Sequence, residues 1–144
     1  MTPFQYTRAS DVADAIRQIA ADPAAKFIAG GTNLIDLMKY DVEHPARLVD
    51  ISHLPLRSVE ETSGGGLRIG ALVPNSDLAY HPLIAQRYPL IASAILSGAS
   101  QQLRNMASTG GNLADGIGDV AGACILERGH DRSIACWIAA TMFG

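Results

Sequence analysis

The chain has 144 residues, of which 48% are hydrophobic and 17% charged, and its formal net charge is −3 at pH 7. This composition is typical of a globular protein with a buried core and excludes an intrinsically disordered chain. The acidic balance and the 6% aromatic content argue against nucleic-acid binding, which needs positive charge or stacking side chains. The N-terminus lacks the pattern of a signal peptide, and no apolar run approaches the length of a membrane span. We therefore expect a cytoplasmic protein that binds neither membrane nor nucleic acid.

The two cysteines and four histidines do not have the spacing of a disulfide framework, a metal site or a catalytic motif. Cys124 and Cys136 are too few for a disulfide framework and lack the spacing of metal ligands, so we expect free thiols in a reducing compartment. His44 and His81 each precede a proline and are expected to be turn residues, and His53 and His130 have no partner at ligand spacing. The chain has no Gly-x-Ser-x-Gly nucleophile motif. We therefore expect no metal site and no catalytic side chain.

The first third of the chain alternates helix and strand. Ser10 is expected to cap an amphipathic helix over residues 11–21. An apolar run at residues 26–29 predicts a buried strand that ends at a glycine pair, with a second helix beginning just after it. Residues 47–51 predict the next strand. A strand, a helix and a strand over this length favour a parallel βαβ unit with a right-handed crossover.

Near residue 55 the pattern changes to antiparallel. Alternating residues at 58–62 and 67–72 flank three consecutive glycines, which predicts a hairpin. We therefore predict an α+β fold with a small parallel α/β lobe over residues 1–55 and a second, antiparallel lobe that starts over residues 56–114.

Two helices are expected in the second lobe. Asn75 or Ser76 is expected to cap a short helix that His81-Pro82 ends. Apolar spacing over residues 89–97 predicts another helix, which Gly98 stops.

Two glycine pairs about eighty residues apart each lie beside a hydroxyl and an amide side chain. The first glycine segment comprises Ile28, Ala29, Gly30, Gly31, Thr32, Asn33 and Leu34. The second glycine segment comprises Ser108, Thr109, Gly110, Gly111 and Asn112. A structural turn or helix cap explains either pair alone. The functional alternative is a ligand with two phosphates or a long body, bound by backbone N–H groups from both sides. Gly98-Ala99-Ser100 adds a small-residue segment suited to close approach by a flat ring.

Four segments, in this order and spacing, resemble one protein family. They are Ala29-Gly30-Gly31-Thr32-Asn33-Leu34, Ile69-Gly70-Ala71, Leu103-Arg104-Asn105 and Thr109-Gly110-Gly111-Asn112. The chain from Phe4 to Leu113 resembles the FAD-binding (medium) subunit of the molybdenum hydroxylases. That family includes the carbon monoxide dehydrogenase medium subunits and the flavin domains of xanthine and aldehyde oxidoreductases. Within it, the chain looks most similar to the flavin subunit of bacterial periplasmic-type aldehyde oxidoreductases.

The resemblance implies a vanillyl-alcohol-oxidase-type, or PCMH-type, FAD-binding domain whose two lobes clasp the cofactor. It assigns the FAD pyrophosphate to the first glycine segment, the neighbourhood of the flavin to Gly98 and Ala99, and further contacts to the second segment. The cofactor-binding residues that it implies are Ile28, Ala29, Gly30, Gly31, Thr32, Asn33, Leu34, Gly98, Ala99, Ser108, Thr109, Gly111 and Asn112.

The resemblance also implies partners. A large subunit with a molybdenum cofactor would oxidise the substrate, a small subunit with iron–sulfur clusters would relay the electrons, and FAD would pass them to a final acceptor. An export signal on a partner would make the complex periplasmic instead of cytoplasmic.

The family pattern stops near the second glycine segment. Family subunits are about twice as long, with room for one or two further lobes. Residues 115–144 do not resemble their continuation: Ala121 stands where the family commonly has aspartate, and Asp119 is out of register. We therefore expect a truncated or frame-shifted chain with a divergent tail. Two alternatives stay open, a remnant that binds flavin weakly or not at all, and a small-ligand binding module without a redox partner.

Overall fold

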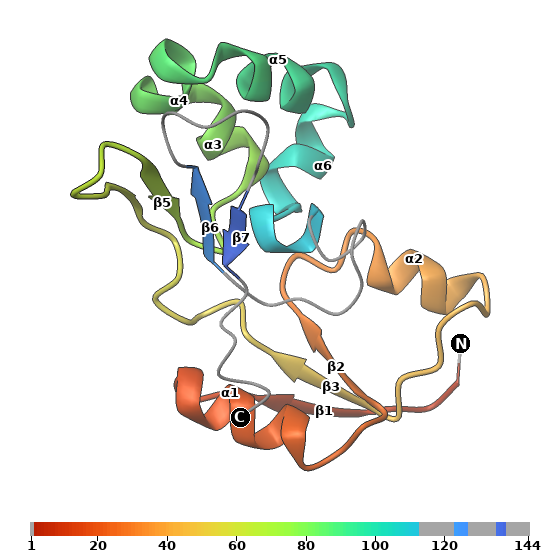
Figure 1. The fold of residues 1–144 in the computed structure, drawn as a ribbon. Helices are drawn as coiled ribbons and strands as arrows, with labels where there is room; N and C mark the ends of the chain where they lie inside the picture. Colours follow the sequence, from red (N-terminus) through yellow and green to blue (C-terminus); the bar gives the residue numbers. More distant parts are fainter. Residues whose placement is uncertain (1, 113–122, 127–134, 138–144) are drawn as a thin grey trace.

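The first part of the fold is a three-stranded parallel sheet. The computed structural model of the protein describes residues 2–112, 123–126 and 135–137. The strands β1 (Gln5–Arg8), β3 (Arg47–Asp50) and β2 (Ala25–Ile28) lie in the order β1–β3–β2 (Figure 1). The parallel pairing of β2 with β3 confirms the predicted unit. β1 was not predicted, because its residues are mostly exposed and therefore form no apolar run.

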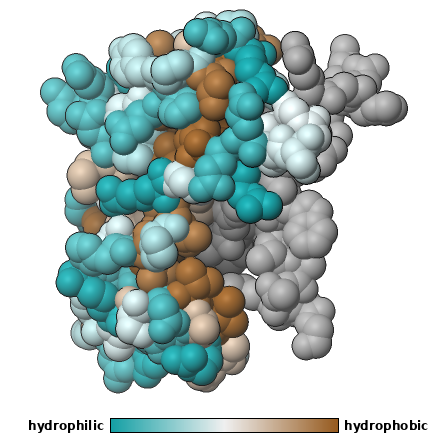
Figure 2. Space-filling model, turned by 90° about the vertical axis from the view of Figure 1, so that its left-hand side faces the viewer, coloured by the Kyte–Doolittle hydropathy of each residue, from teal (hydrophilic) through white to brown (hydrophobic). Residues whose placement is uncertain are grey.

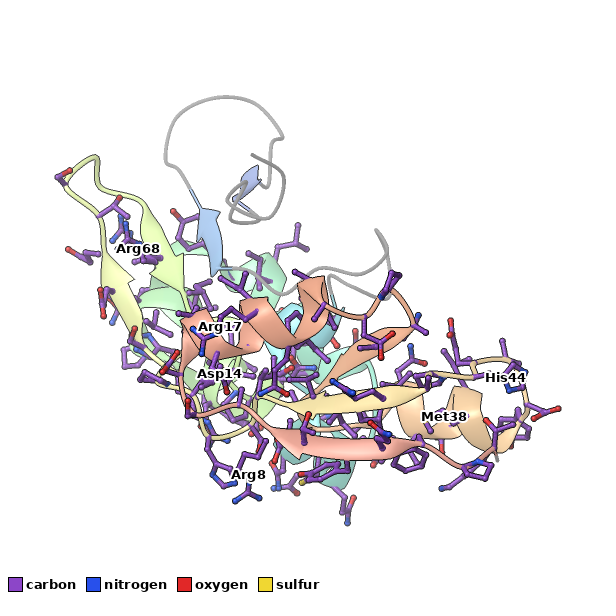
Figure 3. All side chains as sticks on the ribbon, turned by 90° about the horizontal axis from the view of Figure 1, so that it is seen from below. Arg8, Asp14, Arg17, Met38, His44 and Arg68 are labelled. Atoms are coloured by element: carbon purple, nitrogen blue, oxygen red, sulfur yellow. The ribbon has the colours of Figure 1, made fainter. Side chains whose placement is uncertain are left out.

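The helix α1 (Val12–Ala20) is confirmed, but the expectation that Ser10 caps it is wrong. Asp11 is the N-cap, and its side chain accepts a hydrogen bond from the Asp14 N–H at 2.7 Å. The Ser10 N–H donates in return to the Asp14 carboxylate at 2.9 Å. Asp14 also forms an ion pair with Arg17 one turn later, 3.1 Å away (Figure 3). This reciprocal arrangement satisfies two N–H groups at the helix start, as in a capping box.

The helix α2 (Leu34–Lys39) lies between β2 and β3 in the chain, as predicted. It begins at Leu34, the last residue of the first glycine segment, with Asn33 at its N-cap position. Met38 is fully buried and anchors this short helix, which has too few residues to be stable without packing. The glycine segment is therefore held between a strand of the sheet and a packed helix.

The second part contains a four-stranded antiparallel sheet in the order β4–β5–β6–β7. The strands β4 (Val59–Glu61) and β5 (Leu67–Ile69) form the predicted hairpin, and Gly65 adopts a positive φ of 79° in its turn. The strands β6 (Ala123–Leu126) and β7 (Ala135–Trp137) extend the sheet from β5. Both lie in the tail, where no strand was predicted because the alternation there is weak.

Four helices connect β5 to the second glycine segment (Figure 1). Two of them, α3 (Asn75–Tyr80) and α5 (Pro89–Ser97), were predicted. The expected cap of α3 is wrong, because this helix begins at Asn75 after Pro74 and has no side-chain cap. Two further helices, α4 (Pro82–Arg87) and α6 (Gln101–Met106), were not predicted.

Two apolar clusters form the core. One packs α1 against the parallel sheet and includes Val49 and Ile51. The other packs α3, α4 and α5 against the β4–β5 hairpin and includes Leu67 and Ile84. Seen from the side, apolar side chains gather in a band over the middle of the molecule (Figure 2). Leu72 comes after residue 55 in the chain but packs into the first cluster, with residues of the predicted first lobe. The two clusters therefore do not divide the chain at residue 55, and the lobe boundary there stays a prediction.

Candidate functional site

The first glycine segment leaves the parallel sheet at the end of β2 and passes directly against α6. A Cβ atom on Gly30 would overlap the carbonyl oxygen of Met106, so only glycine allows this backbone approach. Gly31 has a positive φ of 72°, and a side chain there would also meet the end of Ile35. Each glycine is thus required for a different reason: Gly30 because the backbone of α6 is too close for a side chain, and Gly31 because its φ is positive.

The second glycine segment is the start of a short helical stretch at residues 109–112 rather than an irregular turn. The Thr109 hydroxyl and backbone N–H both donate to the carbonyl of Val73, each at 3.0 Å. The Gly110 N–H donates to the carbonyl of Ala71 at 2.8 Å. Ser108 accepts a hydrogen bond from the Gly111 N–H at 3.3 Å, which is the local turn considered as the structural alternative. This segment is therefore bound firmly to the loop that connects β5 to α3.

A cleft of about 500 Å³ lies where the two glycine segments meet the helices α3, α5 and α6. This volume is within the range of about 300–1,000 Å³ that is usual for small-molecule sites. Its lining residues are Thr32, Asn33, Asp36, Asn75, Ala94, Ile95, Gly98, Ala99, Leu103, Arg104, Ala107 and Asn112. The cleft combines apolar contributions from α5 and α6 with hydroxyl and amide side chains from the glycine segments.

Five of the thirteen cofactor-binding residues implied by the resemblance line this cleft. They come from three separate segments of the chain, Thr32 and Asn33, Gly98 and Ala99, and Asn112. The other eight, which include Gly30 and Thr109, lie beside the cleft lining in the chain without forming it. All thirteen assignments remain predictions, since a folding role accounts for Gly30, Ser108 and Thr109 as well.

Several lining residues were not among the predicted cofactor-binding residues, and the most polar of them are Asp36, Asn75 and Arg104. The Arg104 guanidinium donates to the carbonyls of Ala99 at 2.5 Å and Leu96 at 3.3 Å, so it holds the end of α5. Asn75 was interpreted only as a possible helix cap. Its place in the cleft depends on how α3 packs against α6, which no local motif signals.

The carboxyl end of the parallel sheet, where the first glycine segment starts, is held by Asp50. This carboxylate accepts hydrogen bonds from the Tyr6 hydroxyl at 2.6 Å, the Arg8 guanidinium at 3.1 Å and the Ser52 N–H at 2.9 Å. Burial raises the pKa of Asp50, but the hydrogen bonds from Ser52, Tyr6 and Arg8 outweigh it and lower that pKa from 3.8 to about 2. Asp50 therefore stays ionised and ties β1 to β3.

Within residues 2–112, 123–126 and 135–137, no group of three or more His, Cys, Asp or Glu side chains could hold a metal ion. No helix in the same ranges is long and apolar enough to cross a membrane.

Comparison with known proteins places these features in context. A family model described as the FAD binding domain in molybdopterin dehydrogenase matches residues 2–127. The chain is 51% identical over 113 residues to the aldehyde oxidoreductase FAD-binding subunit PaoB of Escherichia coli, a match that covers 78% of this chain and 36% of PaoB. It is 36% identical to the carbon monoxide dehydrogenase medium chain of Hydrogenophaga pseudoflava, over 78% of this chain and 40% of that one.

Solved structures agree with the sequence matches. A chain of quinoline 2-oxidoreductase from Pseudomonas putida 86 superimposes with a TM-score of 0.74 at 30% identity, over 78% of this chain and 40% of that one. A chain of carbon monoxide dehydrogenase from Hydrogenophaga pseudoflava gives the same TM-score at 34% identity, over 79% and 41%. The predicted α+β fold class is thus confirmed. The chain spans about two fifths of the length of the relatives it matches.

Proposed function

Because the chain belongs to the family of FAD-binding domains of molybdopterin dehydrogenases, we propose that it binds FAD in the cleft between its two glycine segments. Bound there, FAD would serve as an electron carrier within a larger oxidoreductase complex. The family and its cofactor agree with the resemblance seen in the sequence, and the family match extends to residue 127, beyond the Leu113 at which that resemblance ended.

The observation that carries this proposal is the convergence of three distant segments on one cleft. Thr32 and Asn33, Gly98 and Ala99, and Asn112 are separated by up to eighty residues in the chain, yet they line the same cavity. A glycine pair with only a folding role would not require the other segments to meet it at a cavity of ligand size.

The chemistry of the lining fits a flavin dinucleotide. The N–H groups of Gly31 and Thr32 donate no hydrogen bond within the described part of the chain, so they can donate to an anion such as the pyrophosphate. Ala94 and Ile95 offer apolar contacts, and the absence of a side chain at Gly98 allows a flat ring to approach closely. The protein's part is to bind and orient the cofactor, while FAD when bound supplies the ability to accept and release electrons.

The wider role follows from the names of the relatives. We propose that the chain corresponds to the N-terminal portion of the flavin subunit of an aldehyde- or xanthine-type oxidoreductase, in which a molybdenum-containing large subunit and an iron–sulfur small subunit supply the electrons. The substrate would then bind to the large subunit. This proposed assignment gives the chain itself no catalytic side chain.

FAD binding is tested by a matched pair of charge substitutions. Ala99 and Ala85 are both exposed alanines, but only Ala99 lines the cleft. We expect Ala99→Glu to weaken FAD binding by about tenfold or more, because a larger, charged side chain would occupy the space that the flavin ring needs, and Ala85→Glu to leave the affinity unchanged. The measurement is a titration of FAD fluorescence and visible absorbance with the full 144-residue chain. A folded wild-type chain that does not bind FAD would contradict the proposal and favour the non-binding remnant.

The partner assignment needs a separate test. A tagged chain should retain molybdenum- and iron-containing subunits from extracts of its native host, measured by metal analysis of the eluate. Recovery of an FAD-loaded chain alone would instead favour a binding module without redox partners.

A further inference from the structure

One residue of the cleft lining, Asn75, has a buried side-chain oxygen with no hydrogen-bond partner in the described part of the chain. Asn75, the first residue of α3, is only 7% exposed, and its side-chain Oδ1 is buried and unpartnered. The residue itself is held in place, because its backbone N–H donates to the carbonyl of Ala107 at 2.9 Å. Asn75 is nevertheless one of the residues that line the cleft.

An unpartnered buried acceptor is costly, and such groups in native proteins call for an explanation. Two other buried side-chain atoms share this condition among the described residues, Arg47 Nε and His81 Nδ1, but neither residue lines the cleft. A ligand in the cleft that donates a hydrogen bond would supply the partner that the protein lacks. The position of Asn75 therefore points to a ligand contact.

The chemistry of Asn75 Oδ1 restricts which part of the ligand it can meet. At neutral pH the pyrophosphate oxygens of FAD are acceptors and would repel another acceptor. The donors of FAD are the isoalloxazine N–H, the ribityl and ribose hydroxyls, and the adenine amino group. We propose that Asn75 Oδ1 accepts a hydrogen bond from one of these donors on either side of the pyrophosphate, an inference that rests on the proposed FAD site.

This role predicts that Asn75→Ala affects the ligand-free chain and the FAD-bound chain differently. Asn75→Ala removes an acceptor that is unsatisfied without ligand, so the stability of the ligand-free chain should be unchanged or raised. The same change removes a contact to bound FAD, so its affinity should fall by about tenfold. Since alanine is smaller than asparagine, a steric block of the cleft does not account for such a loss.

The test compares Asn75→Ala with Gln86→Ala, which removes a side-chain amide from an exposed position of α4 outside the cleft. The probes are FAD, riboflavin and ADP, titrated against the 144-residue wild-type and variant chains, with the thermal midpoint of each ligand-free chain. We expect weaker FAD binding only for Asn75→Ala. A parallel loss for riboflavin assigns the donor to the flavin half, and a loss for ADP assigns it to the adenosine half.

The failures are distinguishable. If wild type binds FAD and Asn75→Ala binds it equally well, the Asn75 contact is overturned while the FAD site stands. If Asn75→Ala lowers the thermal midpoint of the ligand-free chain or does not fold, Asn75 has a structural partner and the inference is overturned. If the folded wild type does not bind FAD, the proposed function fails for this chain, and the inference falls with it.

Discussion

The two glycine pairs have nearly the same local sequence, but the structure uses their glycines differently. In the first pair both positions are constrained, Gly30 by the carbonyl of Met106 and Gly31 by its positive φ. In the second pair only Gly110 is crowded, where a Cβ would lie 2.9 Å from the Cβ of Ala71, whereas Gly111 would meet only the Ser108 hydroxyl at 3.2 Å. Similar motifs therefore need not share a physical cause, and substitutions can separate the two.

The largest effect is expected at Gly30. Gly30→Ala places a methyl group onto the backbone of α6, which cannot move without shifting the helix, so we expect a loss of about 3 kcal/mol or more in unfolding free energy. Urea denaturation measures it. Gly64→Ala is the matched control, because a Cβ there meets nothing within 4 Å. A stability equal to that of the control would show that the first glycine segment does not pack on α6.

The next largest effect is expected at Asp50, which lies at the end of the parallel sheet where the first glycine segment starts. Asp50→Asn removes the negative charge of a side chain that accepts three hydrogen bonds. We expect the unfolding free energy at pH 7 to fall by about 2 kcal/mol. Because the pKa of Asp50 is lowered from 3.8 to about 2, its contribution is complete above about pH 4 and is lost as the pH falls toward 2. The difference in unfolding free energy between wild type and Asp50→Asn should therefore shrink over that interval. A constant difference would mean that the ionised carboxylate is not what ties β1 to β3.

A smaller effect is expected at Gly31. Gly31→Ala forces an alanine into the left-handed region, which costs about 1–2 kcal/mol, while the contact with the end of Ile35 can relax by side-chain rotation. Gly31→Asn should cost less, because asparagine tolerates positive φ better than alanine does. The comparison of the two midpoints in urea separates conformation from crowding: equal losses would point to crowding by Ile35.

The sequence was sufficient to predict a helix or strand where a local pattern of residues determines it. Apolar runs and glycine positions predicted β2, α2, β3 and the β4–β5 hairpin, and the ordered motifs identified the family. It was insufficient where packing decides. The helix α4 begins with Pro82 at its first position, which is favourable for a helix start, but His81-Pro82 was interpreted only as a helix end.

The site shows the same limit. Thr32, Gly98 and Asn112 were predicted from motifs, but nothing in the sequence near Asn75 indicates that α3 packs against α6 and brings this residue to the same cleft. Likewise Asp50 was predicted only to lie within the strand at residues 47–51, because its partners Tyr6 and Arg8 lie more than forty residues away on the unpredicted β1. Long-range pairing of this kind leaves no local signature.

The smallest effect on stability is expected at Gly111, and it completes the comparison between the pairs. Gly111 lies in a helical stretch without a positive φ, so Gly111→Ala should leave the unfolding free energy within about 0.5 kcal/mol of wild type. Gly110→Ala, one residue earlier, should be clearly less stable because of Ala71. If Gly111 is nevertheless a cofactor-binding residue, Gly111→Ala will weaken FAD binding severalfold in a titration while its urea midpoint stays unchanged. An unchanged affinity would leave Gly111 without a role in binding and would restrict the second pair's contribution to the neighbouring Asn112.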